Sequence, residues 1–302
     1  MRALLGLSII GLALSGCAPP KENGGPETLA PIRSAKVPEA TALIPKDFRF
    51  AEPGTFTVAM TVGQLPLADY SQDGKSVVGV EPGFAQLVAD SLGLKLRIVP
   101  VAWADWPLGL TSGKYDAVMS NVTVTEERKD KFDFSTYRDD KLGIYTRADG
   151  PLKSVSKPAD IAGLKVAVGA STNQSQILDR WNATNVAAGR KPAEPQYYDD
   201  DGIGRLAVLS GRADVSFGPN ATAGYQARDG RTRKIGEVAG GWPDTAYIAV
   251  TTRKGSGLAV AITTALNAQI ANGTYRKLLE RWNLVSEGIA KSQTNPPGLP
   301  RK

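Results

Sequence analysis

The sequence predicts an α/β protein made of two similar lobes, and two observations lead to this prediction. Short apolar runs typical of buried strands alternate along the chain with helical patterns, an order that favours mostly parallel sheets flanked by helices. A glycine, a basic residue, any residue and Asp also precede two apolar runs, in SGKYDAV at 112–118 and SGRADVSF at 210–217. This repetition indicates two related lobes with a cleft between them.

The first block of alternating elements begins at residue 55. Its helix is the clearest element, because Phe84, Leu87, Val88 and Leu92 fall on one helical face and Gly93 follows as a C-terminal cap. Strands are expected where short apolar runs end at polar or glycine-rich segments. In order, the block contains a strand at 55–60, the helix at 82–92, a strand at 95–99, a short helix at 106–111 and a strand from Tyr115.

A second block follows Gly150, and proline-rich segments flank the two blocks. The same reasoning places strands at 164–168, 196–198, 213–217 and 247–251, and helices at 173–181, 202–210, 221–228, 257–272 and 275–282. Residues 17–53 carry many prolines and glycines and show no helix or strand period, so we expect a flexible linker there. We expect a flexible tail over 289–302 for the same reason.

Composition excludes several classes of function. The chain has 302 residues, 42% hydrophobic and 22% charged, which is typical of a soluble globular protein. Its net charge of +6 is spread among acids without a basic stripe, so we expect no nucleic-acid partner. The absence of histidine excludes Ser-His-Asp and Cys-His catalysis and histidine-based zinc sites, and we expect no metal and no cofactor.

The first residues have the pattern of a signal peptide. Arg2 precedes an apolar run at 3–14 that is too short to span a bilayer, and Ser15 and Gly16 lead to Cys17. This pattern resembles a bacterial lipobox, which implies removal of residues 1–16 and a diacylglycerol on the Cys17 sulfur. The alternative is an ordinary signal peptide with a chance cysteine. Cys17 is the only cysteine of the chain, which favours the lipobox and excludes an internal disulfide.

The run SGKYDAVMSNVTVTEERKDKFDFS at 112–135 joins a buried strand to hydroxyl groups and an arginine. The guanidinium of Arg128 offers a planar fork that matches a carboxylate with two hydrogen bonds. The end of this strand therefore indicates a site for an anionic group. The alternative is a solvated arginine beside Glu126 and Glu127.

Together with LGLKLRIVPVAWADW at 92–106, SGRADV at 210–215 and YIAVTTRKGSGL at 247–258, this run resembles the periplasmic amino-acid-binding proteins of ABC importers, solute-binding protein family 3. The resemblance covers about 55–286 and implies the type II periplasmic-binding-protein fold, with a two-strand hinge. Lobe one would hold 54–142 and 248–288, and lobe two 143–247. The lobes would close around a ligand.

The resemblance also implies the residues of a site. In this family an arginine in the TxTxxR run grips the α-carboxylate of the ligand, which assigns that role to Arg128, aided by the hydroxyl and N–H of Thr123. The further positions in lobe one that match pocket-lining positions are Asn121, Trp103, Thr61 and Gln64. Core packing is the alternative for Trp103, and an ordinary β-branched strand residue is the alternative for Thr123.

In lobe two, Ser171, Thr172 and Asn173 lie where a strand passes into a helix. Because N–H groups at the start of a helix favour anions, these residues are expected to complete the carboxylate clamp. Helix capping by Thr172 or Asn173 is the alternative, and both roles can coexist.

One departure from the family concerns the ligand's α-ammonium group. Relatives carry an Asp after the second-lobe strand, whereas this chain has Gly218, Pro219 and Asn220 there. Asn220 offers an oxygen but no charge, and a buried ammonium without a counter-charge is costly. Either another acid serves, or the ligand has no ammonium group. The candidate acids are Asp199, Asp200, Asp201 and Asp244.

We therefore expect an extracytoplasmic, lipid-anchored, monomeric binding protein rather than an enzyme. It would capture a small carboxylate-bearing solute, foremost an amino acid, and deliver it to an ABC permease. One alternative is a ligand-sensing module for a signalling partner. The other is a dehydratase-like enzyme on the same fold, although no paired carboxylates stand at a strand end to act as acid and base.

Overall fold

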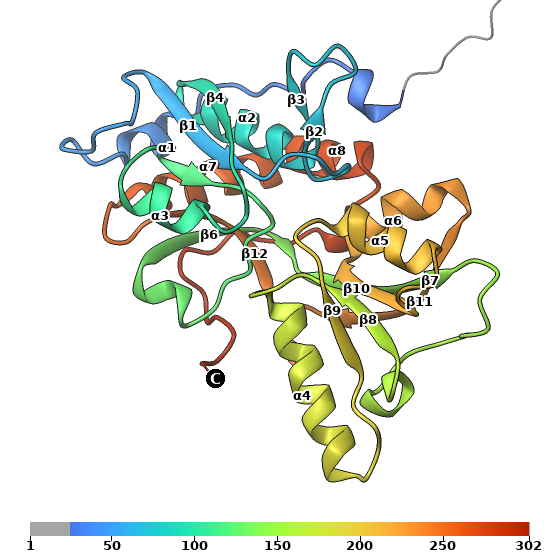
Figure 1. Ribbon diagram of the computed structural model, residues 1–302. Helices are drawn as coiled ribbons and strands as arrows, with labels where there is room; N and C mark the ends of the chain where they lie inside the picture. Colours follow the sequence, from blue (N-terminus) through green and yellow to red (C-terminus); the bar gives the residue numbers. More distant parts are fainter. Residues whose placement is uncertain (1–24, 302) are drawn as a thin grey trace, which may run out of the picture.

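The computed structural model describes residues 25–301, so Cys17 and the expected signal peptide lie outside the described residues. Two lobes stand side by side, each built on a five-stranded sheet with helices around it (Figure 1). The α/β class and the two-lobed architecture are as the sequence predicts. Within residues 25–301, no helix is both long and apolar enough to cross a membrane.

The sheet of lobe one has the strand order β4-β1-β5-β12-β6. Strands β4 and β5 run parallel to β1, whereas β12 is antiparallel to both of its neighbours. The strands are β1 (Thr55–Met60), β4 (Lys95–Pro100), β5 (Ala117–Val118), β6 (Phe132–Asp139) and β12 (Tyr247–Arg253). The helices are α1 (Pro38–Ala42), α2 (Val80–Leu92), α3 (Trp106–Thr111), α7 (Leu258–Ala271) and α8 (Thr274–Arg281). A small hairpin of β2 (Asp69–Tyr70) and β3 (Val77–Val78), which the sequence did not predict, lies beside α2.

The sheet of lobe two has the order β11-β7-β10-β8-β9, with β8, β9 and β10 parallel. Its strands are β7 (Lys141–Arg147), β8 (Lys165–Val168), β9 (Glu194–Tyr197), β10 (Val215–Pro219) and β11 (Thr232–Ala239). Its helices are α4 (Asn173–Ala187), α5 (Asp201–Leu209) and α6 (Asn220–Gln226). Short 3-10 turns complete the two lobes at Pro26–Thr28, Arg128–Asp130, Pro158–Ile161, Ala227–Asp229 and Val285–Glu287.

The chain passes between the lobes twice. Strand β6 ends at Asp139 in one sheet and β7 begins at Lys141 in the other, so Asp140 is the first crossing. The second crossing spans 240–246, between β11 and β12. The boundaries expected after 142 and 247 thus fall inside the strands that follow each crossing.

The structure differs from the expected flexible linker at 17–53. In the described part, Arg33 forms two hydrogen bonds to Asp90, and the N–H of Val37 donates to the carbonyl of Ser91 at 2.8 Å. Ala40 in α1 is fully buried. The prolines set an extended path, and the apolar residues between them pack on the core of lobe one.

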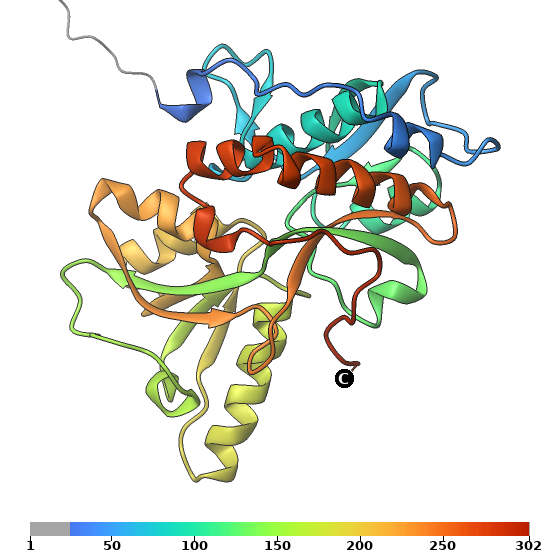
Figure 2. The same cartoon turned by 180° about the vertical axis from the view of Figure 1, so that it is seen from behind.

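The expected flexible tail also differs. Residues 292–295 run along β6, which is the edge strand of its sheet, and hydrogen-bond to it (Figure 2). An edge strand exposes unpaired backbone groups, and the tail supplies partners for them. A sequence pattern of four polar residues followed by two prolines gives no sign of such pairing.

The packed N-terminal segment leads to a stability prediction. Ala40→Asp is expected to lower the free energy of unfolding by about 2 kcal/mol or more, because it places a carboxylate at a fully buried position. Urea unfolding of the protein measures this change. Ala42→Asp is the matched control, since Ala42 is exposed in the same helix. Equal free energies of unfolding in the two variants would contradict this packing and support the expected flexible linker.

Candidate ligand-binding site

The predicted site residues gather where the parallel strands of the two lobes end. In lobe one, β1, β4 and β5 lead into Thr61, Trp103 and Asn121. In lobe two, β8 leads into Ser171 and β10 into α6. Ligands of α/β sheets bind beyond the carboxyl ends of parallel strands, so the fold brings two such edges to one cleft.

Arg128 stands on the lobe-one side, where the chain turns after β5. Its Nη1 donates to the carbonyl of Thr123 at 2.9 Å, and its guanidinium carbon lies 5.5 Å from the ring centre of Trp103. Nε and Nη2 have no hydrogen-bond partner within residues 25–301. Burial lowers the pKa of Arg128 to about 10, so the group stays charged at neutral pH. The structure thus brings Arg128, Thr123 and Trp103 together and leaves part of the guanidinium fork available.

Asp140 was missed by sequence reasoning and stands at the first crossing. It is buried, and its Oδ2 accepts from the hydroxyl of Thr123 at 2.7 Å and from the amide of Asn173 at 2.8 Å. The same amide also donates to the carbonyl of Gly240. The Thr123 hydroxyl and the Asn173 amide thus both bind Asp140 in this structure, and their contact with a ligand stays a prediction. Burial raises the pKa of Asp140 to about 6.

Two more of the predicted residues form hydrogen bonds with a second buried cluster of charged side chains. Arg138 pairs with Glu81 and Glu287, and all three side chains are about 1% exposed. The Arg138 guanidinium also donates to Asn121 Oδ1 at 2.5 Å. From lobe two, Asn220 donates to Glu287 at 3.3 Å and accepts from Tyr145 at 3.2 Å. Asn121 and Asn220 are polar partners of this cluster, and their contact with a ligand stays a prediction.

The remaining predicted residues lie around the cleft. Gln64 donates across it to Asp200 Oδ2 at 2.9 Å, so its amide joins the two lobes. Thr61 is exposed, and its N–H donates to the hydroxyl of Ser120. Thr172 caps α4, because its side chain accepts from the N–H of Ser175. Helix capping was the alternative role predicted for Thr172. Ser171 has a φ of 57° and turns the chain into that helix.

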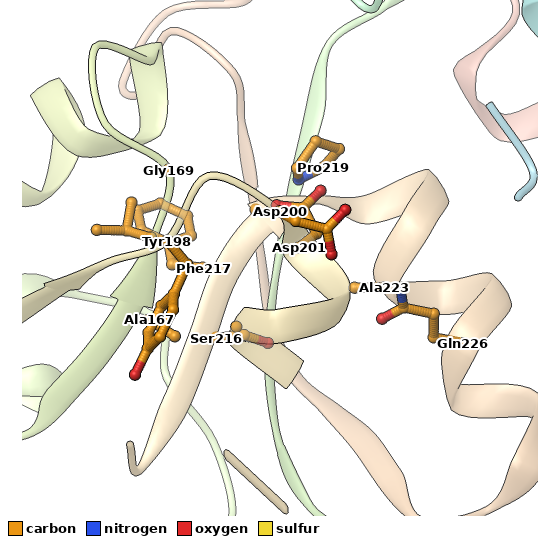
Figure 3. Close-up of a pocket in the computed structure, with 13 residues that line it drawn as sticks. Ala167, Gly169, Tyr198, Asp200, Asp201, Ser216, Phe217, Pro219, Ala223 and Gln226 are labelled. Carbon is orange, nitrogen blue, oxygen red and sulfur yellow. The ribbon is translucent and has the colours of Figure 1, made fainter. Parts of the chain in front are cut away.

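A small pocket opens at the strand ends of lobe two (Figure 3). It is lined by residues of β8 and β10, by Tyr198 and by the start of α5, with Asp200 and Asp201 close together beside Pro219. Its volume of about 20 Å³ suits one water-sized group. Asp201 has no hydrogen-bond partner within residues 25–301. Burial, and then the charge of Asp200, raise the pKa of Asp201 to about 6.

Comparison with known proteins decides the family. The model of the bacterial extracellular solute-binding proteins, family 3, matches residues 56–285. The chain belongs to this family. The L-cystine-binding protein TcyJ of Escherichia coli (strain K12) is 30% identical over 239 residues, which cover 76% of this chain and 83% of that protein. A solved ancestral arginine-binding protein bound to arginine matches with a TM-score of 0.66 and 27% identity, over 76% of this chain and 98% of that chain.

One enzyme is also similar to this family 3 protein. Cyclohexadienyl dehydratase of Pseudomonas aeruginosa is 32% identical over 182 residues, which cover 60% of this chain and 65% of that enzyme. The relatives are mainly transport binding proteins, and the family is extracellular. Within residues 25–301, no group of three or more acidic or cysteine side chains is arranged to hold a metal.

The departure at 218–220 has a structural counterpart in this family 3 protein. A Cβ atom built on Gly218 would lie 3.5 Å from Asp201 Oδ1. The carboxylate of Asp201 therefore lies within van der Waals distance of a side chain at position 218. Sequence reasoning listed Asp201 among four acids but could not select it, because helix α5 brings it there from a separate part of the chain.

Proposed function

We propose that this protein works outside the cytoplasm, where it captures an α-amino acid between its lobes and delivers it to an ABC permease. The observation that carries the proposal is a pair of opposite charges with unused hydrogen-bonding atoms, one at the strand ends of each lobe. Arg128 leaves Nε and Nη2 free on the lobe-one side, and Asp201 is an unpartnered carboxylate of the described chain on the lobe-two side. An amino acid carries the two complementary charges at one carbon.

Each lobe has a proposed role in recognition. Arg128 would bind the α-carboxylate with two hydrogen bonds while Trp103 walls the cleft beside it. The start of α4, at Ser171 and Thr172, would add N–H groups from lobe two. Asp201 would take the α-ammonium in the water-sized pocket. The names of the relatives make L-arginine, L-glutamine and L-cystine the first probes.

The lobes must part for a ligand to enter. Hydrogen bonds from Gln64 to Asp200 and from Asn220 to Glu287 join the lobes, and Ala221 of α6 packs into the core of lobe one. These contacts hold the two lobes against each other in this structure. Ligand contacts to both lobes would shift the population among closed and open forms, as hinge proteins do.

We propose transport rather than catalysis. Asp140 and Asp201 are the acids of the cleft with a pKa near neutrality, but Asp140 already accepts two hydrogen bonds. The dehydratase relative makes turnover the second candidate. Mass spectrometry of a ligand incubated with the protein separates the two, since a transport protein returns it unchanged.

Arg128→Ala is expected to weaken amino-acid binding by about 2–5 kcal/mol, because the ligand's carboxylate loses a charged, two-pronged partner. Isothermal calorimetry with the three probes measures the loss. Arg128→Lys keeps the charge but not the fork, so we expect an intermediate affinity. Arg276→Ala, which removes an exposed arginine paired with Glu280, is the control. Unchanged affinity in Arg128→Ala would contradict the carboxylate role.

Binding is expected to depend on pH through Asp201. With a pKa of about 6 in the free protein, Asp201 loses its charge as the pH falls, so the dissociation constant at pH 5 should be about tenfold higher than at pH 7.5. Asp201→Asn should bind weakly at both pH values and lose this dependence. A variant that retains the full pH dependence would assign it to another group, such as Asp140, and contradict the role of Asp201.

We also propose that lipid on Cys17 holds the protein at the membrane as a monomer. Wild-type cells fed a labelled fatty acid should label the protein and retain it in the membrane fraction, whereas Cys17→Ala should do neither. Membrane retention of the unlabelled variant would contradict the anchor.

A further inference from the structure

The C-terminal segment 292–301 lies beyond the residues that match the family, yet it is docked on lobe one. The Ser292 hydroxyl donates to the carbonyl of Thr136 at 2.6 Å, and Asn295 Oδ1 accepts from the N–H of Phe134 at 2.8 Å. Figure 2 shows the segment running along β6 and ending below lobe one. It therefore follows the strand from the hinge back to the turn that carries Arg128.

At its end, the segment pairs with the residues that precede Arg128. Leu299 donates its N–H to the carbonyl of Val124 at 3.0 Å, and its carbonyl accepts from the N–H of Glu126 at 2.8 Å. Thr125, which lies between them, accepts from the N–H of Arg128 through its hydroxyl at 3.0 Å. The N–H of Gly298 donates to Glu126 Oε1 at 2.7 Å. The backbone on both sides of Thr125 is thus held by the tail.

The same segment touches the second crossing between the lobes. A Cβ atom on Gly241 would lie 2.2 Å from a methyl carbon of Leu299, so this side chain sits directly on the Gly241 backbone. A cavity of about 530 Å³ separates the end of the tail from α4 of lobe two. Leu299 therefore contacts the turn that carries Arg128 on one side and a hinge segment on the other.

We propose that residues 292–301 position the guanidinium of Arg128 for the ligand's carboxylate. The same residues would link this position to the hinge through the contact of Leu299 with Gly241. The role in binding rests on the proposed function. Residues 119–127 lie outside the named strands, and β12 pairs with Val122 and Val124 on one side while Leu299 of the tail pairs with Val124 and Glu126 on the other. A loop already fixed in its binding conformation loses less conformational freedom when the ligand binds. Arg128 touches the ligand in this account, and the tail acts through it.

Gly298 offers a test by a small change. A Cβ atom there would lie 2.8 Å from the carbonyl carbon of Thr125 and 3.0 Å from the nitrogen of Glu126, so Gly298→Ala should push the tail off this turn. Gln293→Ala is the matched control, because its side chain is exposed in the same segment. A second variant that ends after Thr294 removes the contacts without adding a clash.

Two readouts separate docking from binding. Hydrogen exchange at the N–H of Glu126 should accelerate in both variants and not in the control, with the ligand absent. Calorimetry with L-arginine, L-glutamine and L-cystine should give a dissociation constant raised by about tenfold for the probe that wild type binds. Variants that exchange faster but bind with wild-type affinity would overturn the positioning role alone. Exchange at Glu126 as slow as in wild type, measured in the truncated variant, would also overturn the positioning role. A wild type that binds none of the probes would instead contradict the proposed function.

Discussion

The buried arginine at the lobe junction is the constraint on which the cleft depends. Arg138 lies near the end of β6, just before the chain leaves lobe one, and it pairs with Glu81 at the start of α2 and with Glu287 near the end of the domain. Removing one partner of such a buried group typically costs about 3–5 kcal/mol, because the remaining charges lose their compensation. Burial raises the pKa of Glu81 even with Arg138 beside it. The cluster therefore fixes three distant segments together, orients Asn121, and reaches lobe two through Asn220.

Around this junction, charged groups that already have hydrogen-bond partners can be distinguished from those with unused donor or acceptor atoms. Asp140, Glu81 and Glu287 all have partners within the protein, whereas Arg128 keeps unused donors and Asp201 keeps an unused carboxylate among the described residues. A zwitterion is the ligand that complements such a pair. In this account Asp201, which lies beside Gly218, takes the role of the acid that the family resemblance places after this strand. The proposed ligand is therefore still an amino acid, although the acid proposed to bind its ammonium group stands on α5.

The elements with strong local patterns were predictable, and those set by distant contacts were not. Helix 82–92 and strand 55–60 carry apolar periods that reflect their own burial, and Arg128 with Trp103 lies in runs typical of the family. Asp140 was not predicted, because its hydrogen bonds come from Thr123 and Asn173, which arrive from different lobes. The N-terminal segment and the tail were read as flexible from their prolines. Their order comes from side chains and edge-strand groups supplied by lobe one, which no local pattern reveals.

The most direct test is a thermal-shift panel on the mature chain, unfolded and refolded to remove carried-over ligand. The panel pairs each common α-amino acid with its α-amide and with the carboxylate that lacks the amino group. We expect at least one amino acid to stabilise the protein by about 2.7 kcal/mol at a hundredfold excess over its dissociation constant, with neither of its analogues doing so. Stabilisation by carboxylates without an amino group, equal to that by the amino acid, would contradict the pairing of Arg128 with Asp201 across the cleft.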